Sequence, residues 1–189
     1  MLLYNEILKD IPVASVQATH QIGTVVEPVI DPRDLSIPAL AVQAPRRQGN
    51  LLLFTSDVRS MGGKGIIIDH DEQLMEAEGL VRLKEVLNFK FQLIGKRVET
   101  EDGNKLGSVS RFAFHADGWK IAKLHVSPTL GKTLGTSGSI IDRQQIVKVS
   151  DSRIVVKSAG IKAGSRFSWR RLFLGTAKPA LEPETAQTD

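Results

Sequence analysis

The sequence predicts a mainly β protein in which two small, similar β-barrels follow one another and are joined by a helical linker. Three observations support this fold class. A stretch of the first half recurs in the second half, and both stretches alternate strand-like segments with turn signals. The segment between them is rich in residues that favour helices.

The repeat is clearest in QIGTVVEPVIDPRDLSIPALAV (21–42), which aligns without a gap with KLGSVSRFAFHADGWKIAKLHV (105–126) at an offset of 84 residues. Further along, SDVRSMGGKGIIID (56–69) aligns with QQIVKVSDSRIVVK (144–157) at an offset of 88. Each unit is therefore expected to contain three successive strands joined by turns, then a loop, a short helical or irregular turn and a final strand.

Turn signals lie at equivalent places in the two units. IDPRD (30–34) has an Asp-Pro step, and HADGW (115–119) has an Asp-Gly step typical of hairpins. Pro28 falls inside an expected strand. Because proline cannot donate to a ladder, it predicts an edge position or a bulge there.

The segment DEQLMEAEGLVRLKEVLNF (71–89) predicts the linker helix, since four apolar residues have helical spacing: Leu80, Leu83, Val86 and Leu87. The acidic run DHDE (69–72) is expected to cap that helix, with weak cation binding as the alternative. The expected organisation is a first barrel over 1–70, the linker over 71–89, a second barrel over 90–164, a basic aromatic segment over 165–175 and a disordered tail over 176–189.

Composition is that of a soluble globular protein, with 41% hydrophobic and 24% charged residues among 189. The absence of cysteine excludes disulfides, thiol catalysis and cysteine-containing zinc sites. With neither a secretory signal nor a run of apolar residues long enough to span a bilayer, a bacterial cytoplasmic location is expected, with a peripheral membrane location as the alternative.

Charge is distributed unevenly along the chain. Residues 1–88 hold 8 Lys/Arg and 12 Asp/Glu, a net charge of −4, whereas residues 89–189 hold 17 and 9, a net charge of +8. The second half is therefore able to attract an anionic partner. The alternative is a chance distribution over solvated surfaces.

The two units resemble PRC-barrel domains, the family that includes the photosynthetic reaction centre H subunit and the C-terminal domain of the ribosome maturation factor RimM. The resemblance rests on IPVASVQATHQIGTVVEPVIDP with SDVRSMGGKGIIID, and on LIGKRVETEDGNKLGSVSRFAFHADG with QQIVKVSDSRIVV. It implies small six-stranded barrels that mostly mediate protein–protein contacts, without a catalytic centre or a cofactor. It also implies that Gly23 and Gly107 are structural glycines, at positions where the backbone bends tightly or takes a positive φ.

The stretch TLGKTLGTSGS (129–139) ends like a phosphate-binding loop at Gly131-Lys132-Thr133, but Val126 stands where that motif needs its first glycine. It is instead expected to be the loop after the third strand of the second unit. Its Lys132 then occupies a loop tip equivalent to Arg46 and Arg47.

No metal or nucleophile site is expected. The four histidines form no short-spaced pair; His115 and His125 can approach across adjacent strands but have no carboxylate partner. The sequence also has no Gly-x-Ser-x-Gly elbow.

The segment SRFSWRRLFLG (165–175) combines arginines with Trp169 and Phe173. As a helix it would place Trp169 and Phe173 on one face and Arg166 and Arg170 on another, suited to an anionic membrane or a partner protein. The alternative is that it folds back onto a barrel. The candidate contact residues are Arg46, Arg47, Lys132, Arg166, Trp169, Arg170 and Arg171.

The favoured function is a non-enzymatic protein–protein interaction or adaptor module, with an unknown protein as partner and no small-molecule substrate. Two alternatives stay open. One is an RNA- or ribosome-associated assembly factor, suggested by the basic second half. The other is a peripheral membrane protein anchored on an anionic surface through residues 165–175.

Overall fold

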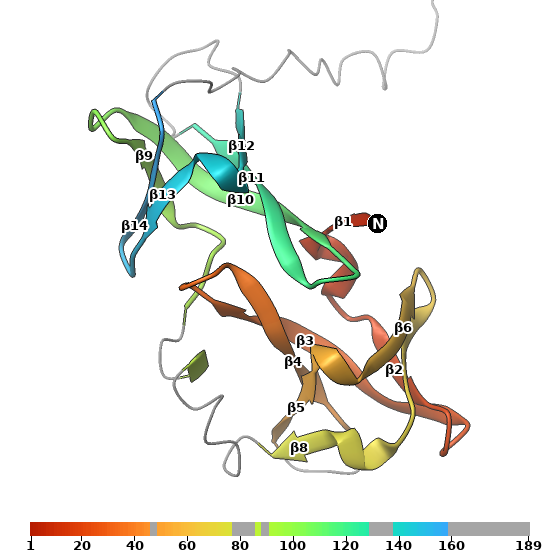
Figure 1. Cartoon of the computed structure of the whole chain (residues 1–189). Coiled ribbons are helices and arrows are strands. Elements are labelled where there is room, and N and C mark those ends of the chain that lie inside the picture. The colour runs from red at the N-terminus through yellow and green to blue at the C-terminus, as the bar shows by residue number, and fades with distance from the viewer. Residues whose placement is uncertain (46–48, 77–85, 88–90, 129–137, 159–189) are drawn as a thin grey trace, which may run out of the picture.

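The computed structural model describes residues 1–45, 49–76, 86–87, 91–128 and 138–158. These residues are mainly β, and the helical turns between strands are short 3-10 helices (Figure 1). No helix in this part of the chain has the length and apolar character needed to cross a membrane.

The first half is built from strands that pair in a simple order. They are β2 (Pro12–Ser15), β3 (His20–Asp31), β4 (Ser36–Gln43), β5 (Asn50–Phe54), β6 (Val58–Gly62) and β7 (Gly65–Ile68). The strands β2, β3, β4 and β5 form an antiparallel meander, and β7 pairs with β6 on one edge and runs parallel to β2 on the other. A 3-10 helix, η2 (Thr55–Asp57), joins β5 to β6.

The second half repeats this order. Its strands are β9 (Arg97–Thr100), β10 (Lys105–His115), β11 (Lys120–Ser127), β12 (Ser139–Asp142), β13 (Ile146–Val149) and β14 (Arg153–Val156). The strands β9 to β12 form the meander, β14 runs parallel to β9 and antiparallel to β13, and η5 (Arg143–Gln145) joins β12 to β13. The two halves therefore share one order of strand pairing.

A bulge at the same place in each half keeps the apolar side chains on the inner face. In β10 the register shifts between Val109 and Arg111, so Ser110 is the extra residue and Val109 and Phe112 both point inward. In β3 the shift lies between Val25 and Glu27. A second shift follows Val29, so Pro28 itself pairs in register with Leu40 and lies between two bulges rather than in one. The pairing of β3 with β2 ends at Thr24, so Pro28 lies beyond that ladder, in agreement with the predicted edge position.

The two halves meet edge to edge through their central hairpins. Ser36 of β4 pairs with Lys120 of β11, and these residues are equivalent in the repeat. The Ile37 N–H donates to the Trp119 carbonyl at 2.7 Å, and the Ile121 N–H donates to the Leu35 carbonyl at 2.9 Å. Each bond is the repeat equivalent of the other, so the halves are related by an approximate two-fold axis between β4 and β11.

The segments that precede the two halves are exchanged. The strand β1 (Leu2–Tyr4) adds to β10 of the second half, and the Asn5 side-chain oxygen accepts the Phe112 N–H at 2.8 Å. In return, Val86 packs with Ala39, Ala41 and Leu52 on the first half. The segment that precedes each half in the sequence therefore packs on the other half. The predicted domain boundaries at residues 70 and 90 stay predictions.

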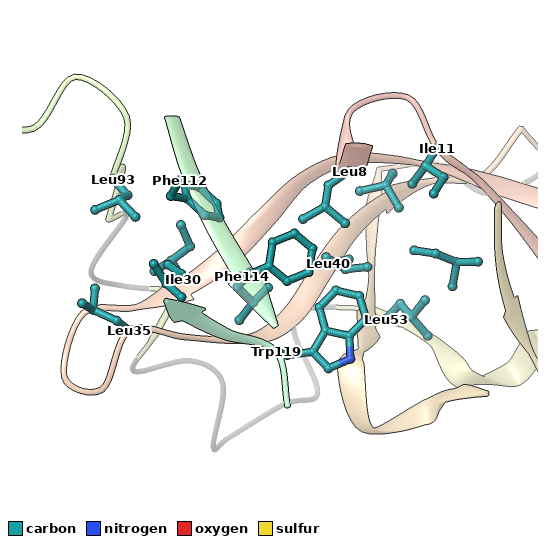
Figure 2. Packing of buried hydrophobic residues seen from close by; sticks show 14 of the residues in the cluster. Leu8, Ile11, Ile30, Leu35, Leu40, Leu53, Leu93, Phe112, Phe114 and Trp119 are labelled. Atoms are coloured by element: carbon teal, nitrogen blue, oxygen red, sulfur yellow. The ribbon is translucent and has the colours of Figure 1, made fainter. Parts of the chain in front are cut away.

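One apolar cluster runs through both halves. It includes Leu8, Leu40 and Leu53 from the first half and Phe112 and Phe114 from the second, all buried (Figure 2). Because the cluster is continuous across β4 and β11, removing a large side chain from either half opens a cavity next to the other.

Within the described part of the predicted linker, residues 71–76 do not form an α-helix. Residues 71–73 form the 3-10 helix η3 (Asp71–Gln73), and β8 (Leu74–Glu76) then pairs with β5. The pairing to β5 overrides the helix propensity of Leu, Met and Glu. Val86 and Leu87 have helical backbone, whereas residues 77–85 and 88–90 lie outside the described residues. The acidic residues Asp71 and Glu72 do lie in the first turn of a helix, but that helix is η3 and not the predicted linker helix. The Gln73 side chain accepts the His70 N–H there.

The described ladders form an open path rather than closed barrels. In order it is β13, β14, β9, β10, β11, β4, β3, β2, β7 and β6. The mainly β class is confirmed, and two closed barrels are not.

Thr19→Gly is expected to stabilise the protein by up to about 1 kcal/mol, because Thr19 holds φ at 59° in the turn between β2 and β3 and a β-branched residue is strained there. Chemical denaturation measures the difference. Ala18→Gly is the matched control, since Ala18 has no positive φ and glycine there only adds freedom to the unfolded chain. A loss of stability in both variants would contradict the assignment of strain.

Candidate interaction site at the junction of the two halves

The junction is formed by two equivalent turns with the same backbone conformation. In the first, the Leu35 N–H donates to the Asp31 carbonyl at 2.9 Å, and in the second the Trp119 N–H donates to the His115 carbonyl at 2.8 Å. Leu35 and Trp119 have φ values of 52° and 51°, a left-handed conformation that is uncommon for large side chains. Both residues direct their side chains into the apolar cluster. Burial there offsets the strain.

Trp119 is the largest side chain at the junction, and 8% of its surface is exposed. Its indole stacks on Phe114 with ring centroids 5.6 Å apart and an interplanar angle of 19°, and Phe114 in turn lies against Phe112 (Figure 2). The stacking fixes the orientation of the indole. None of the described residues accepts a hydrogen bond from its N–H.

A cleft of about 660 Å³ lies over this tryptophan. One wall comes from the second half and the N-terminus, through Met1, Asp117 and Gly118; the other comes from η2 and β6 of the first half, through Ser56, Arg59 and Ser60. Thr55 is fixed in its floor, because its hydroxyl donates to the Ile37 carbonyl at 2.8 Å. The cleft therefore combines an aromatic floor with hydroxyl groups and charges on its rim.

The N-terminus is held at the rim by a charge pair. The Met1 ammonium lies 3.1 Å from Asp117 Oδ1. The hydrogen bond that the Asp117 carboxylate accepts from its own backbone N–H lowers its pKa, and the hydrogen bond from the Met1 ammonium lowers it further. Both partners are well exposed, so the pair orients the rim and contributes little to stability.

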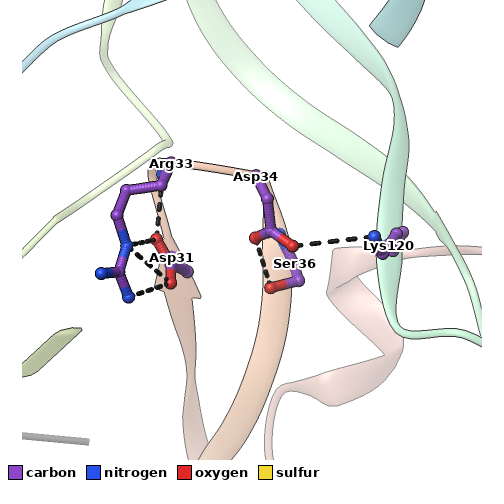
Figure 3. A network of polar contacts seen from close by, with 5 residues as sticks. All are labelled: Asp31, Arg33, Asp34, Ser36 and Lys120. Atoms are coloured by element: carbon purple, nitrogen blue, oxygen red, sulfur yellow. Dashed lines mark hydrogen bonds and ion pairs between the residues drawn. The ribbon is translucent and has the colours of Figure 1, made fainter. Parts of the chain in front are cut away.

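A polar network connects the first turn to the second half (Figure 3). The Arg33 guanidinium donates to both oxygens of the Asp31 carboxylate, at 2.7 Å from Nη2 and 3.0 Å from Nε. Asp34 accepts from the Ser36 hydroxyl at 2.6 Å and lies 3.7 Å from Lys120 Nζ. The turn is thereby held in the conformation in which Leu35 bonds to Ile121 and Ile37 bonds to Trp119.

Asp31→Asn is expected to destabilise the protein by about 1–2 kcal/mol at pH 7, because Asp31 is buried and accepts charge-assisted hydrogen bonds. The side-chain hydrogen bond from Arg33 lowers the pKa of Asp31 below its usual value of 3.8, although burial raises it. The stabilisation is therefore present above about pH 4 and is lost as the pH falls through the lower folded pKa. Denaturation from pH 2 to 7 should show a smaller loss on acidification in the variant; identical pH profiles would contradict this role.

A second hollow, of about 370 Å³, is also formed by both halves. Its floor includes Phe112 and Leu93, and its rim exposes Val26 and Ile94, 44% and 45% accessible. Glu27 is the acidic group in its lining. The groove is lined mainly by apolar residues, with Asn5, Lys9 and Gln92 as its other polar residues.

The outer face of the second half carries an aromatic and basic cluster. The Tyr4 ring lies edge-on to His125 at 5.4 Å, and the Arg111 guanidinium lies 4.5 Å from the Tyr4 ring centre. Burial and then the charge of Arg111 lower the pKa of His125, with a smaller contribution from Lys123, although the charge of Glu6 raises it.

The predicted sites are placed as follows. His115 pairs with Lys120 and His125 pairs with Arg111 across the strands, so the two histidines do not meet. Within the described ranges no three metal-ligating side chains come together. The predicted contact residues all lie outside the described residues: Arg46, Arg47, Lys132, Arg166, Trp169, Arg170 and Arg171.

Both predicted structural glycines lie where another chain segment approaches closely. Gly107 has a φ of 138°, and a Cβ atom there would come 1.9 Å from the Ser127 carbonyl oxygen. At Gly23 a Cβ would come 2.6 Å from Val42 Cγ1, without a positive φ. The positive φ is therefore confirmed for Gly107 only, and close approach explains Gly23.

Sequence reasoning missed Trp119 and the N-terminus as parts of a site. The available signal was a large aromatic residue directly after the Asp117-Gly118 turn, where polar residues are usual.

Comparison with known proteins places a family domain on the second half. The PRC-barrel domain family matches residues 87–160, which cover β9 to β14. No curated protein matches this chain.

Proposed function

We propose, from the PRC-barrel domain at residues 87–160, that this protein is a non-enzymatic protein-interaction module made of two PRC-type units in tandem. One observation carries the extension to the first half. Its strands repeat the pairing of the matched half, including the parallel pair β2–β7 that corresponds to β9–β14. A parallel pair within an otherwise antiparallel meander is a specific feature, because it requires the chain to cross back to the first strand.

The cleft at the junction suits binding to a protein segment. Its tryptophan is fixed by Phe114, and Arg59 and Ser60 lie on the rim. Tryptophan and arginine in a pre-formed hollow are the residues that most often dominate binding energy in protein interfaces. Because both halves line the cleft, one half alone cannot provide this site.

The proposal is tested by capture with the full-length chain. Ser56→Arg and Ser60→Arg each put a long charged side chain into the cleft from an exposed position. Ser152→Arg, on an exposed bend away from the cleft, is the matched control. We expect a partner that wild type and the control retain and that both cleft variants lose. Capture of no specific partner, or equal capture by all four proteins, would overturn the proposal.

A second proposal, association with RNA or the ribosome, is favoured by the basic second half, where the exposed side chains of Arg97 and Arg111 lie on β9 and β10. Such binding would be lost steeply as salt is raised, since counterions are released from phosphates. Sedimentation with ribosomes at low salt is the expected result, and its absence would end this proposal.

A further inference from the structure

The strands β5 and β12 are equivalent in the repeat, but their outer edges differ. Both pair on one edge with the preceding strand of the meander. The other edge of β5 is covered by β8. The other edge of β12 pairs with nothing in the part of the chain that the structure describes.

The pairing of β8 with β5 shows which side chains a strand paired with β12 needs. In the first half, Leu74 of β8 lies opposite Leu53, and both are buried, while Met75 lies opposite Leu52 and is 39% exposed. At the offset of 88 residues, Leu53 corresponds to Ile141 and Leu52 to Ile140. The inward-facing residues match, since Ile141 is buried like Leu53, whereas Ile140 is 41% exposed and Leu52 only 3%.

We propose that the outer edge of β12, which no described residue covers, binds an extended segment of a partner protein, which pairs antiparallel in the way that β8 pairs with β5. The segment presents a large apolar residue opposite Ile141, toward the core. Its neighbour opposite Ile140 is also apolar and lies on the outer face. Main-chain hydrogen bonds to β12 provide the affinity, and the two apolar side chains provide the specificity for the partner sequence.

The chain's own continuation is poorly suited to this edge. At the offset of 88 residues, Leu74, Met75 and Glu76 correspond to Lys162, Ala163 and Gly164, so the sequence has a lysine where β8 has its inward-facing leucine. Alanine and glycine are depleted in strands because they offer little side chain to pack. A partner segment with larger residues therefore matches the β8 pattern better.

The edge is also protected against indiscriminate pairing. It is four residues long, and Asp142 at its end is held 3.0 Å from Lys123 by an ion pair. Short strands with charges nearby are how sheet edges resist aggregation. A partner must therefore match the apolar pair Ile140–Ile141 rather than merely offer an extended backbone.

The test is an NMR titration of the labelled full-length chain with a nine-residue peptide that has the sequence of residues 71–79, DEQLMEAEG. We expect saturable shifts of the amides of residues 139–142. A peptide with methylated amides at Leu, Met and the following Glu keeps the charge and side chains but cannot donate to a ladder, and it should produce none of these shifts. Ile140→Lys should weaken binding about tenfold or more, because a charge replaces the apolar contact on the outer face.

The controls separate this proposal from its alternatives. Val147→Lys changes a residue of β13 that is 49% exposed, similar to Ile140, and should leave the titration unchanged. Ser56→Arg should also leave it unchanged, so failure of the junction cleft and failure of the β12 edge are distinguishable. Absence of saturable shifts, an equal response to the methylated peptide, or shifts confined to other strands would overturn the proposal. So would protection of all four β12 amides from exchange before peptide is added, because the chain itself would then cover the edge.

Discussion

Gly107→Ala is expected to remove most or all of the stability of the protein. The added Cβ would lie 1.9 Å from the Ser127 carbonyl oxygen and 2.7 Å from its carbonyl carbon, and both are backbone atoms of the paired strand. The φ of 138° is also one that residues with a side chain rarely adopt. The strand β10 would have to separate from the end of β11, at a cost of at least about 3 kcal/mol. Chemical denaturation of the purified variant measures the loss.

Two other glycines set the scale for this result. Gly118→Ala meets no atom within 4 Å and has no positive φ, so its stability should be within about 0.5 kcal/mol of wild type. Gly23→Ala should lie between the two, because the nearest atom is a side-chain methyl that can move, whereas the Gln43 carbonyl oxygen lies 3.0 Å away. Wild-type stability in Gly107→Ala would contradict the packing described for β10.

Phe114→Ala is expected to destabilise both halves, by about 3–5 kcal/mol. Phe114 is fully buried, contacts Phe112 and stacks on Trp119, which bonds through its carbonyl to Ile37 of the first half. The cavity left by the ring would lie in the cluster that Leu40 and Leu53 share. Hydrogen exchange of the variant should therefore show loss of protection in β4 as well as in β11.

Val26→Ala is the control for this variant, because Val26 is 44% exposed and lies in β3 rather than in the shared cluster. Its cost should stay below about 1 kcal/mol. Loss of protection limited to the second half in Phe114→Ala would mean that the two cores are independent.

Much of the local structure was predictable because its causes are local. The Asp-Gly step at 117–118 and the Asp-Pro step at 31–32 each lie in a turn between two strands. The glycine of the repeat at 107 is required by close approach and by a positive φ. The repeat itself predicted that both halves share one strand order.

The arrangement of the halves was not predictable from the same signals. The pairing of Ser36 with Lys120 and of Leu2 with His115 joins residues far apart in the chain, and any exposed strand edge competes for such contacts. The residues Leu74 to Glu76 favour a helix in isolation, and only the open edge of β5 makes them a strand. Trp119 could not be predicted as a site residue, because the other wall of its cleft comes from η2 and β6, which are distant in the sequence and lie opposite it only in the folded protein.

The central claim is that two equivalent halves, joined by reciprocal bonds between β4 and β11, form one cooperative unit with a shared core. Native-state hydrogen exchange of the wild-type chain in increasing guanidinium tests it most directly. Leu40 in β4 and Leu124 in β11 are equivalent buried residues of the two halves. Their amides should exchange with the same free energy of opening and the same dependence on denaturant, since both require global unfolding. Two different free energies, each with a smaller denaturant dependence, would show that the halves unfold separately and would contradict the account.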